Sequence, residues 1–412
     1  MTRASRARAL GLVVSLGVAT TAHAGFTCSS VARRGDVDPA GEVFSNRFDE
    51  KVAVSPSGDV LFIGSAGGQR QALYRYRNVG PNGIIARDGD PAPGGSAFGN
   101  FAGSRFGRLS INSAGNAAFI ARLALPGEGV FVDVGGALEK AARTTDLSPS
   151  GGFFVSFPSV SAINDANEVA FIGLTDIGPS GIFRYDADTN LLVTVVDTTA
   201  TDTLGRPFCS FGEVGLSDAG LAFTATVGVP NCLTPIQGVF TASIAGFPAV
   251  TLAGDPSPIG GTTFTSFVRA PETGASITFE ATVSGLTYTG SGIFSSAAPA
   301  TIVAAGDAAP SVGGTVKKLG GQHRQTLAGN VATRLFLRST TAKQGIFLYD
   351  GSPEAGVVKT DTPPVPPFGP SSRYRTIGPP AVDETGAFFA FRAKMLDTVA
   401  PGSKTGVLRC TP

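Results

Sequence analysis

One short motif recurs seven times along this 412-residue chain, and that repetition narrows the folds available to it. The clearest copies read NSAGNAAF, from Asn112 to Phe119, and NDANEVAF, from Asn164 to Phe171. Every copy ends at a phenylalanine, and successive phenylalanines lie about 52–57 residues apart, a spacing within the range of β-propeller blades. The seven are Phe62, Phe119, Phe171, Phe223, Phe279, Phe336 and Phe391.

Each repeat contains the signals of four short strands. An Asn-x-x-Gly segment suits a hairpin turn, because the Asn side chain bonds its own backbone and Gly accepts a positive φ. A strand ending in Phe-x-Ala follows, then one that starts Gly-Ile-Phe or a close variant, then one that leads into a Gly-Asp loop. Helix-period segments are hard to find. The pattern predicts an all-β, seven-bladed β-propeller with four antiparallel strands per blade.

A large and a small residue stand two positions apart on the second strand of most repeats. Such residues point to the same side of a strand, as in Phe119 with Ala121 and Phe171 with Gly173. This arrangement lets neighbouring blades interdigitate. The sixth repeat departs from the pattern, because Arg338 takes the small position when the repeat is aligned on Phe336.

The two ends of the chain supply parts of one repeat. A copy of the fourth strand and its Gly-Asp loop begins at Val31, ahead of the first complete blade, and the chain stops after a third strand. We therefore expect the N-terminal strand to complete the last blade, so that no sheet edge is left open. The four cysteines allow three pairings, and the repeat map favours Cys28 with Cys410 and Cys209 with Cys232.

The first 24 residues have the features of a removable signal peptide. Arginines at the start precede a short apolar run from Ala9 to Ala19, and Ala22-His23-Ala24 supplies a cleavage site. That run is too short to span a bilayer, and no later stretch is long enough. We therefore expect residues 25–412 to form a single exported propeller domain, located in the periplasm or outside the cell, where disulfides persist.

The repeats resemble a known family. They are similar to a bacterial family of secreted tandem-repeat proteins named for its Asn-x-x-Gly-x-x-Ala-Phe motif. The resemblance covers nearly all of the mature chain and is clearest in repeats two to four, whereas later copies such as ETGAFFAF, ending at Phe391, are less regular. It implies a surface or exported repeat protein of unknown biochemical role and no particular chemistry.

Charge and histidine content argue against several classes of function. Without residues 1–24 the chain has three arginines fewer, which leaves 29 basic against 31 acidic residues and a formal charge of −2. This balance gives no electrostatic reason to expect nucleic acid or an anionic membrane as a partner. The mature chain holds one histidine, His323, which argues against multi-histidine metal sites and catalytic triads.

The loops between the second and third strands vary most, as in GVPNCLTPIQ from Gly228 and MLDTVAPGSKT from Met395. They emerge on the same face as the Gly-Asp loops, and variable loops on a constant scaffold are where binding usually occurs. Basic residues that break the repeat lie on or just before the innermost strands, so we hypothesise a basic channel mouth for an anionic group; ion pairing with the loop aspartates or simple solvation is the alternative. They are Arg105, Arg108, Lys317, Lys318, His323, Arg324, Arg373 and Arg375.

Aspartates recur in the Gly-Asp loops and would form a ring. A cation site is one interpretation, but a residue repeated in every blade is more typical of an Asp that caps its own tight turn. Calcium is not otherwise supported, because Asp186-x-Asp188-x-Asn190 lacks the later Gly and Glu of a calcium loop. The ring would contain Asp36, Asp90, Asp146, Asp255, Asp307 and Asp361, with Asp202 a doubtful seventh.

Two classes of function remain open. A binding or scaffolding module, monomeric and free of cofactors, fits the repetition and the variable loops; its ligand would be a glycan, a protein or an anionic small molecule. The alternative is a polysaccharide lyase or hydrolase with its site at the channel mouth, drawing an acid and a base from unique residues such as His323, Tyr288 or Tyr374. Propellers host both classes, and the sequence favours the binding module.

Overall fold

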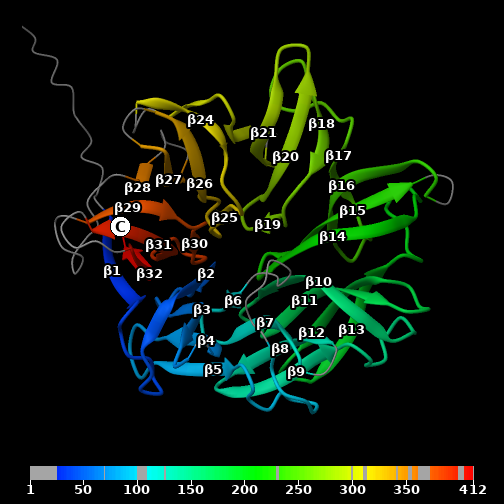
Figure 1. Cartoon of the computed structure of the whole chain (residues 1–412). Helices are drawn as coiled ribbons and strands as arrows, with labels where there is room; N and C mark the ends of the chain where they lie inside the picture. Colours follow the sequence, from blue (N-terminus) through cyan, green and yellow to red (C-terminus); the bar gives the residue numbers. More distant parts are fainter. Residues whose placement is uncertain are drawn as a thin grey trace, which may run out of the picture.

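The protein is a seven-bladed β-propeller, as the repeat predicts (Figure 1). The computed structural model describes residues 26–68, 70–99, 109–124, 127–228, 232–297, 300–309, 313–339, 342–350, 355–360, 372–397 and 403–411. The expected signal peptide, Arg105, Arg108 and Asp361 lie outside these residues. Every element in the described part of the chain is a β-strand, and no helix there is long and apolar enough to cross a membrane.

Blades 1 to 4 each contain four strands in chain order, with antiparallel pairing throughout. The first strand of each blade lies nearest the axis (Figure 1). Their bounds are β2 Phe44–Val54, β3 Val60–Ala66, β4 Arg70–Tyr76 and β5 Gly83–Arg87; β6 Ser110–Ile111, β7 Ala117–Arg122, β8 Glu128–Val134 and β9 Ala137–Arg143; β10 Phe154–Ile163, β11 Glu168–Thr175, β12 Gly181–Asp186 and β13 Leu191–Asp197; and β14 Phe208–Ser217, β15 Gly220–Gly228, β16 Pro235–Ala242 and β17 Ala249–Leu252.

In blades 5 to 7 the innermost strand is split into a longer and a shorter piece, both paired to the second strand. The N-terminal strand β1 completes blade 7 as its outermost strand. The bounds are β18 Thr262–Phe267, β19 Glu272–Thr273, β20 Ile277–Gly285, β21 Thr289–Ser295 and β22 Ala300–Ala304; β23 Ala308–Ala309, β24 Gly314–Leu319, β25 Arg324–Gln325, β26 Val331–Arg338, β27 Gln344–Tyr349 and β28 Ala355–Lys359; and β29 Ser372–Ile377, β30 Ala381–Val382, β31 Phe389–Asp397, β32 Ser403–Thr411 and β1 Thr27–Arg33.

A disulfide between opposite ends of the chain closes the ring. Cys28 on β1 pairs directly with Cys410 on β32, and the two are joined with their Cα atoms 3.9 Å apart. A second disulfide joins Cys209 on β14 to Cys232 in the loop between the second and third strands of blade 4. Both pairings are those predicted from the repeat map. Two disulfides indicate an oxidising environment.

The core lies between neighbouring blades. Ile63 of blade 1 belongs to one buried cluster with Phe119, Ala121 and Phe131 of blade 2. The Phe119 and Phe131 rings stack with centroids 5.8 Å apart, which adds to the gain from burying their surface. A regular blade therefore presents a phenylalanine face to one neighbour and an aliphatic face to the other, and an isolated blade could bury neither.

The structure corrects the sequence alignment of blade 6. Thr333 pairs with Phe347 on the third strand, as Phe279 pairs with Phe294 in blade 5, so Thr333 occupies the motif position that we assigned to Phe336. Leu335, not Arg338, is the neighbour two positions on. The reason is visible in β26: Val331, Leu335 and Leu337 alternate on the buried face, which places Phe336 on the other face, half-buried beneath Lys318 at 4.8 Å.

The Asn-x-x-Gly turns link one blade to the next. Asn112 Nδ2 donates to the carbonyl oxygen of Asn164 at 3.0 Å, between blades 2 and 3. The amide of Asp165 donates to Asp218 Oδ1 at 2.9 Å, between blades 3 and 4. Turns of blades 6 and 7 meet through backbone atoms. We call this end of the ring the turn end. The opposite end carries the Gly-Asp loops and the loops between the second and third strands of each blade, which we call the 2–3 loops. We call that end the loop end.

Candidate functional site

Most of the Gly-Asp loop aspartates accept a hydrogen bond from the backbone of their own loop. The carboxylates of Asp36, Asp146, Asp255 and Asp307 each accept the amide hydrogen of the residue three positions earlier, at 2.7–3.0 Å. Asp90 instead lies 3.6 Å from an Arg70 nitrogen. These contacts account for the repeated aspartates as loop-stabilising residues.

Asp202 belongs to a different position of the loop. Its carboxylate accepts the amides of Leu204 and Arg206 at 2.9 Å, just as Asp38 accepts the amides two and four residues later in the loop before blade 1. Asp202 is therefore the counterpart of Asp38, and Ala200 stands where the other loops carry the repeated aspartate. Asp186 also caps a turn, because it accepts the amide of Asp188 at 2.9 Å.

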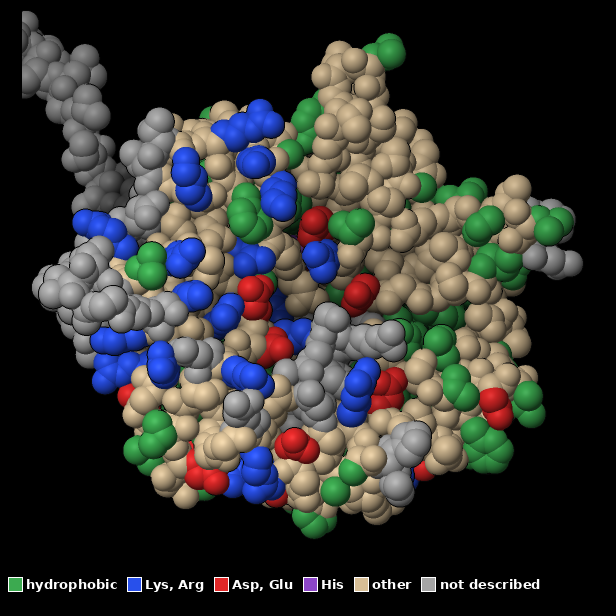
Figure 2. Space-filling view, viewed as in Figure 1, with side chains coloured by type: hydrophobic (Ala, Val, Ile, Leu, Met, Phe, Trp, Pro, Cys, Tyr) green, Lys and Arg blue, Asp and Glu red, His purple; other side chains and the backbone are tan. Residues whose placement is uncertain are grey.

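The predicted basic residues do not form one cluster. Lys317 and Lys318 on β24 and Arg373 and Arg375 on β29 are exposed on blades 6 and 7 at the loop end, whereas Arg324 lies on β25 near the turn end. His323 is fully buried beside Arg324. Figure 2 shows basic side chains gathered over these two blades.

Three ionisable residues missed by the sequence reasoning stand at one equivalent motif position. Glu280 of blade 5, Arg334 of blade 6 and Arg392 of blade 7 each follow the residue at the phenylalanine position of the second strand. Blade 1 has Ile63 there. Recognising that β26 alternates on Val331, Leu335 and Leu337 would have placed Arg334 correctly. The substitutions put charge between blades where the regular repeat puts an aliphatic side chain.

Glu50, on the innermost strand of blade 1, lies between two of these arginines. Its carboxylate oxygens are 3.6 Å from Arg334 Nη1 and 3.4 Å from Arg392 Nη1. Arg334 also donates through Nη1 to the carbonyl of Ile377 at 2.8 Å. Burial lowers the pKa of Arg334, partly offset by Glu50. The carboxylate of Glu50 is thus shared by two guanidinium groups.

Arg269 and Glu280 form the third side of this cluster. Arg269 Nε lies 3.7 Å from Glu280 Oε2. Burial raises the pKa of Glu280 to about 7, although Arg269 acts in the opposite direction. At neutral pH this carboxyl group is therefore partly protonated and neutralises Arg269 only in part.

A glycine just after β24 makes room for Arg334, because a Cβ added to Gly320 would lie 2.8 Å from Arg334 Cγ. Together with their strand neighbours, Arg334 and Arg392 form a surface on blades 6 and 7 that we call the basic wall. It consists of Lys317, Lys318, Arg334, Arg375, Arg392 and Lys394.

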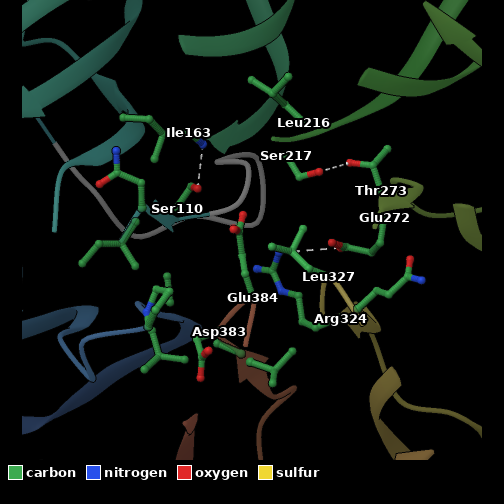
Figure 3. Close-up of a pocket in the computed structure, with 18 of the residues that line it drawn as sticks. Ser110, Ile163, Leu216, Ser217, Glu272, Thr273, Arg324, Leu327, Asp383 and Glu384 are labelled. Carbon is green, nitrogen blue, oxygen red and sulfur yellow. Dashed lines mark hydrogen bonds and ion pairs between the residues drawn. The ribbon is translucent and has the colours of Figure 1, made fainter. Parts of the chain in front are cut away.

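At the turn end, all seven blades line a cavity of about 70 Å³ on the axis. Figure 3 shows Arg324 and Glu384 pointing into it, with Arg324 beside Glu272. Arg324 Nη1 lies 3.7 Å from Glu272 Oε1, and burial lowers the pKa of Arg324 to about 10. The arginine is still charged at neutral pH, so it supplies the positive charge that the acidic lining requires.

Three carboxylates, those of Asp165, Asp218 and Glu384, approach within 4.8 Å of one another beside this cavity and could hold a cation. The two aspartates already accept amides of neighbouring turns, from Ser113 and Asp165, at 2.8 and 2.9 Å. Burial raises the pKa of Glu384 to about 7, and the adjacent aspartates add to the effect. A partly protonated Glu384 reduces the repulsion, so the turn contacts account for the group without a metal ion.

The fold and its axial charges define the class: a seven-bladed β-propeller whose channel is basic on one side at the loop end and acidic at the turn end. The chain belongs to a family of unknown function, DUF7453, whose family model matches residues 15–350. Among curated proteins, none matches the sequence.

Solved structures share the fold at low identity. An oligogalacturonate lyase in complex with manganese has a TM-score of 0.47 and 10% identity, over 94% of this chain and 98% of that one. The β-propeller domain of the trilobed protease from Pyrococcus furiosus has a TM-score of 0.47 and 8% identity, over 89% and 93%. An acylaminoacyl peptidase from Pyrococcus horikoshii has a TM-score of 0.48 and 9% identity, over 87% and 52%. At these values the similarity carries no argument about activity.

Proposed function

We propose that this protein is an exported binding module that takes an anionic group of a glycan against the basic wall at the loop end. The observation that carries the proposal is the local charge. Arg334 and Arg392 share the carboxylate of Glu50, and within the described residues Lys317, Lys318, Arg375 and Lys394 form no ion pair with an acid. An anionic ligand would supply the missing charge.

Hydroxyl groups on blades 4 and 5, the second of which is next to blade 6, support a sugar as the ligand. On blade 4, Ser210 and Thr226 lie 2.7 Å apart through their hydroxyl oxygens. On blade 5, the Thr282 hydroxyl lies 2.7 Å from that of Thr265 and 2.6 Å from that of Ser266. Each hydroxyl retains further donor or acceptor capacity. An acidic sugar could place its anion on the basic wall and its hydroxyls against these residues.

The proposal also includes export of the chain and a monomeric state. The signal-like residues 1–24 and the two disulfides fit a protein that works in the periplasm or outside the cell. The site uses side chains of one chain, so we expect a monomer, and it needs neither calcium nor another cofactor.

The test is calorimetric binding of the mature chain to a polyuronate, a sulfated polysaccharide and a neutral polysaccharide, with and without calcium. We expect binding to the acidic polymers alone, weakening as salt rises. The paired substitution Arg375→Gln with Lys394→Gln should reduce affinity about tenfold or more. The matched control, Lys140→Gln with Arg184→Gln on blades 2 and 3, removes the same charge and should change affinity less than about twofold. Equal losses in both pairs would reject the site.

Glu280 keeps an enzyme as the second candidate. A carboxyl group with a pKa of about 7 near the basic wall has the proton affinity that general acid–base catalysis requires at neutral pH. A lyase acting on a polyuronate would generate a new carbon–carbon double bond, detectable by its ultraviolet absorbance. Appearance of that product with the mature chain, and its loss in Glu280→Gln, would favour the enzyme over the binding module.

A further inference from the structure

We propose that the loop end docks onto an anionic lipid surface, with the tips of three consecutive 2–3 loops inserted among the lipids. The tips are Ile177 of blade 3, Leu233 of blade 4 and Leu286 of blade 5, whose exposed fractions are 89%, 78% and 104%. The inserted tips are distinct from the residues of the proposed glycan site, whereas the cations at this end are shared with it, so substitutions at the tips test this proposal separately.

Exposed apolar side chains are distributed unevenly between the two ends of the ring. The described residues include 17 exposed large hydrophobic side chains. Twelve lie in or beside the 2–3 loops and the Gly-Asp loops, four lie at the turn end, and Val268 lies between. Scattered single apolar residues need no explanation, but concentration at one end marks an interaction surface. Figure 2 shows apolar side chains of this end over blades 3 to 5.

Each of the three apolar tips has an anchoring bond close to it in the sequence. The Cys209–Cys232 disulfide ties the loop of blade 4 to β14 immediately before Leu233. In blade 5, Tyr288 stands two residues after Leu286, and its hydroxyl donates to the carbonyl of Ala305 at 2.8 Å. A loop fixed in this way pays little conformational entropy when its tip is buried by a partner.

The blade 3 loop is anchored in the same manner and is continuous with a second apolar loop. The Asp176 carboxylate accepts the amide of Phe153 at 2.8 Å, and the Asp176 amide donates to the Phe153 carbonyl at 3.0 Å. These bonds join the 2–3 loop carrying Ile177 to the Gly-Asp loop carrying Leu147 and Phe153, both also exposed. The tip thus extends into a wider apolar area.

Basic residues lie at the same end of the ring as the apolar tips, on the two blades that follow blade 5. Lys317 and Lys318 on blade 6 and Arg375 and Lys394 on blade 7 belong to the basic wall, and none of the four forms an ion pair with an acid in the described part of the chain. Aliphatic tips and cations without an acidic partner at one end of the ring match the interface of an anionic bilayer, where headgroups attract Lys and Arg and the acyl region accepts Leu and Ile. The net charge of the whole chain does not reveal this local match.

The composition of the surface favours lipid over protein. Among its twelve exposed apolar residues, Phe153 is the one aromatic, and the others are Val, Leu or Ile. Protein interfaces are enriched in Tyr, Trp and Arg and depleted in Lys, whereas this surface has lysines and no exposed Trp or Tyr in that set. Three tips on separate blades also do not form the continuous packed centre that a protein interface requires.

The experiment is co-sedimentation of the mature chain with phosphatidylcholine vesicles that contain or lack phosphatidylglycerol. We expect binding that requires the anionic lipid. The triple substitution Ile177→Ser, Leu233→Ser, Leu286→Ser should lower the apparent affinity at least about a hundredfold. The matched control is Val79→Ser, Leu191→Ser, Ile244→Ser, which removes three exposed aliphatic side chains from the turn end and should change affinity less than about twofold.

Three results would overturn the proposal. They are a wild-type chain that does not bind anionic vesicles, a tip variant that binds them as well as wild type, and equal losses of affinity in the tip and control variants. A wild-type chain whose mass by analytical ultracentrifugation is halved in the tip variant would show a protein interface between copies instead. Circular dichroism and thermal unfolding of both triple variants establish that each is folded. Retained polyuronate binding in a tip variant that has lost vesicles would separate this surface from the glycan site.

Discussion

Blades 1 to 4 and blades 5 to 7 solve the same packing problem with different residues. At the position between the phenylalanine and the small residue, the first group carries Ile63, Ile120, Ile172 and Thr224, and the second carries Glu280, Arg334 and Arg392. Burying charge costs free energy that burying isoleucine does not. We propose that the charged residues at this position in three successive blades have a role other than stability.

Ring closure falls in the less apolar group. Blade 7 is completed by β1, and the Cys28–Cys410 disulfide joins its two outer strands. A covalent link there prevents the N-terminal strand from separating while the ring is intact. The comparison leads us to propose that the regular blades supply the scaffold and the divergent blades supply the site.

The largest expected effect comes from opening the ring. Cys28→Ser with Cys410→Ser releases a loop closed over 382 residues and should lower the free energy of unfolding by about 5 kcal/mol, measured by denaturant titration. Cys209→Ser with Cys232→Ser releases a separation of 23 residues and should cost about 3 kcal/mol. A smaller loss for the ring-closing pair would contradict its role.

Next in size is the phenylalanine position. Phe171→Ala in blade 3, where the ring is fully buried, should cost about 4 kcal/mol because it leaves a cavity. Phe336→Ala in blade 6 should cost about 1 kcal/mol or less, since the structure places that ring half-buried outside the motif position. If thermal unfolding shows equal losses of stability for the two variants, the alignment that places Phe336 at the motif position would be correct after all.

A smaller effect depends on pH. The pKa of Glu280 is about 7 in the folded state against an ordinary value of 4.5, so folded protein keeps a proton that unfolded protein releases, and stability falls as pH rises between these values. Glu280→Gln should therefore stabilise the protein by about 2 kcal/mol at roughly pH 8 and much less at roughly pH 4. A stabilisation independent of pH would show that burial of the charge is not its cause.

The smallest effect concerns Thr333, which replaces phenylalanine in blade 6. Its hydroxyl is buried without a hydrogen-bond partner in the described structure. Thr333→Val removes that unsatisfied group and should raise the free energy of unfolding by about 1 kcal/mol. Thr224→Val on blade 4 is a useful contrast, because the Thr224 hydroxyl accepts the amide of Glu213 at 2.9 Å and its loss should destabilise.

Repetition made the fold predictable. Seven copies of one motif and a displaced fourth strand sufficed for the blade number, the closure and both disulfides, because each repeat is one sheet that can bury its faces only against its neighbours. This reasoning failed in blade 6. The motif position there holds Thr333 instead of phenylalanine, and the sequence was therefore aligned on the nearest phenylalanine, Phe336.

The site was less predictable for a physical reason. Exposed residues such as Lys317 and Arg375 stood out because they interrupt the repeat, but Glu280, Arg334 and Arg392 are separated by more than fifty residues in sequence and meet only when blades pack. The division of charge between the two ends likewise depends on which side of a strand each residue faces. Arg324 illustrates this, because it lies on β25, the strand that follows the β24 of Lys317, and yet lines a separate acidic cavity.

The central claim is that the charges of blades 5 to 7 serve a ligand rather than the fold, and Arg392→Ile tests it by restoring the residue type of blade 3. Arg392 Nε is buried without a hydrogen bond in the described part of the chain, so the variant should be at least as stable as wild type by thermal unfolding. Its affinity for the polyuronate, measured by calorimetry, should fall about tenfold or more. Unchanged affinity together with loss of stability would contradict the account.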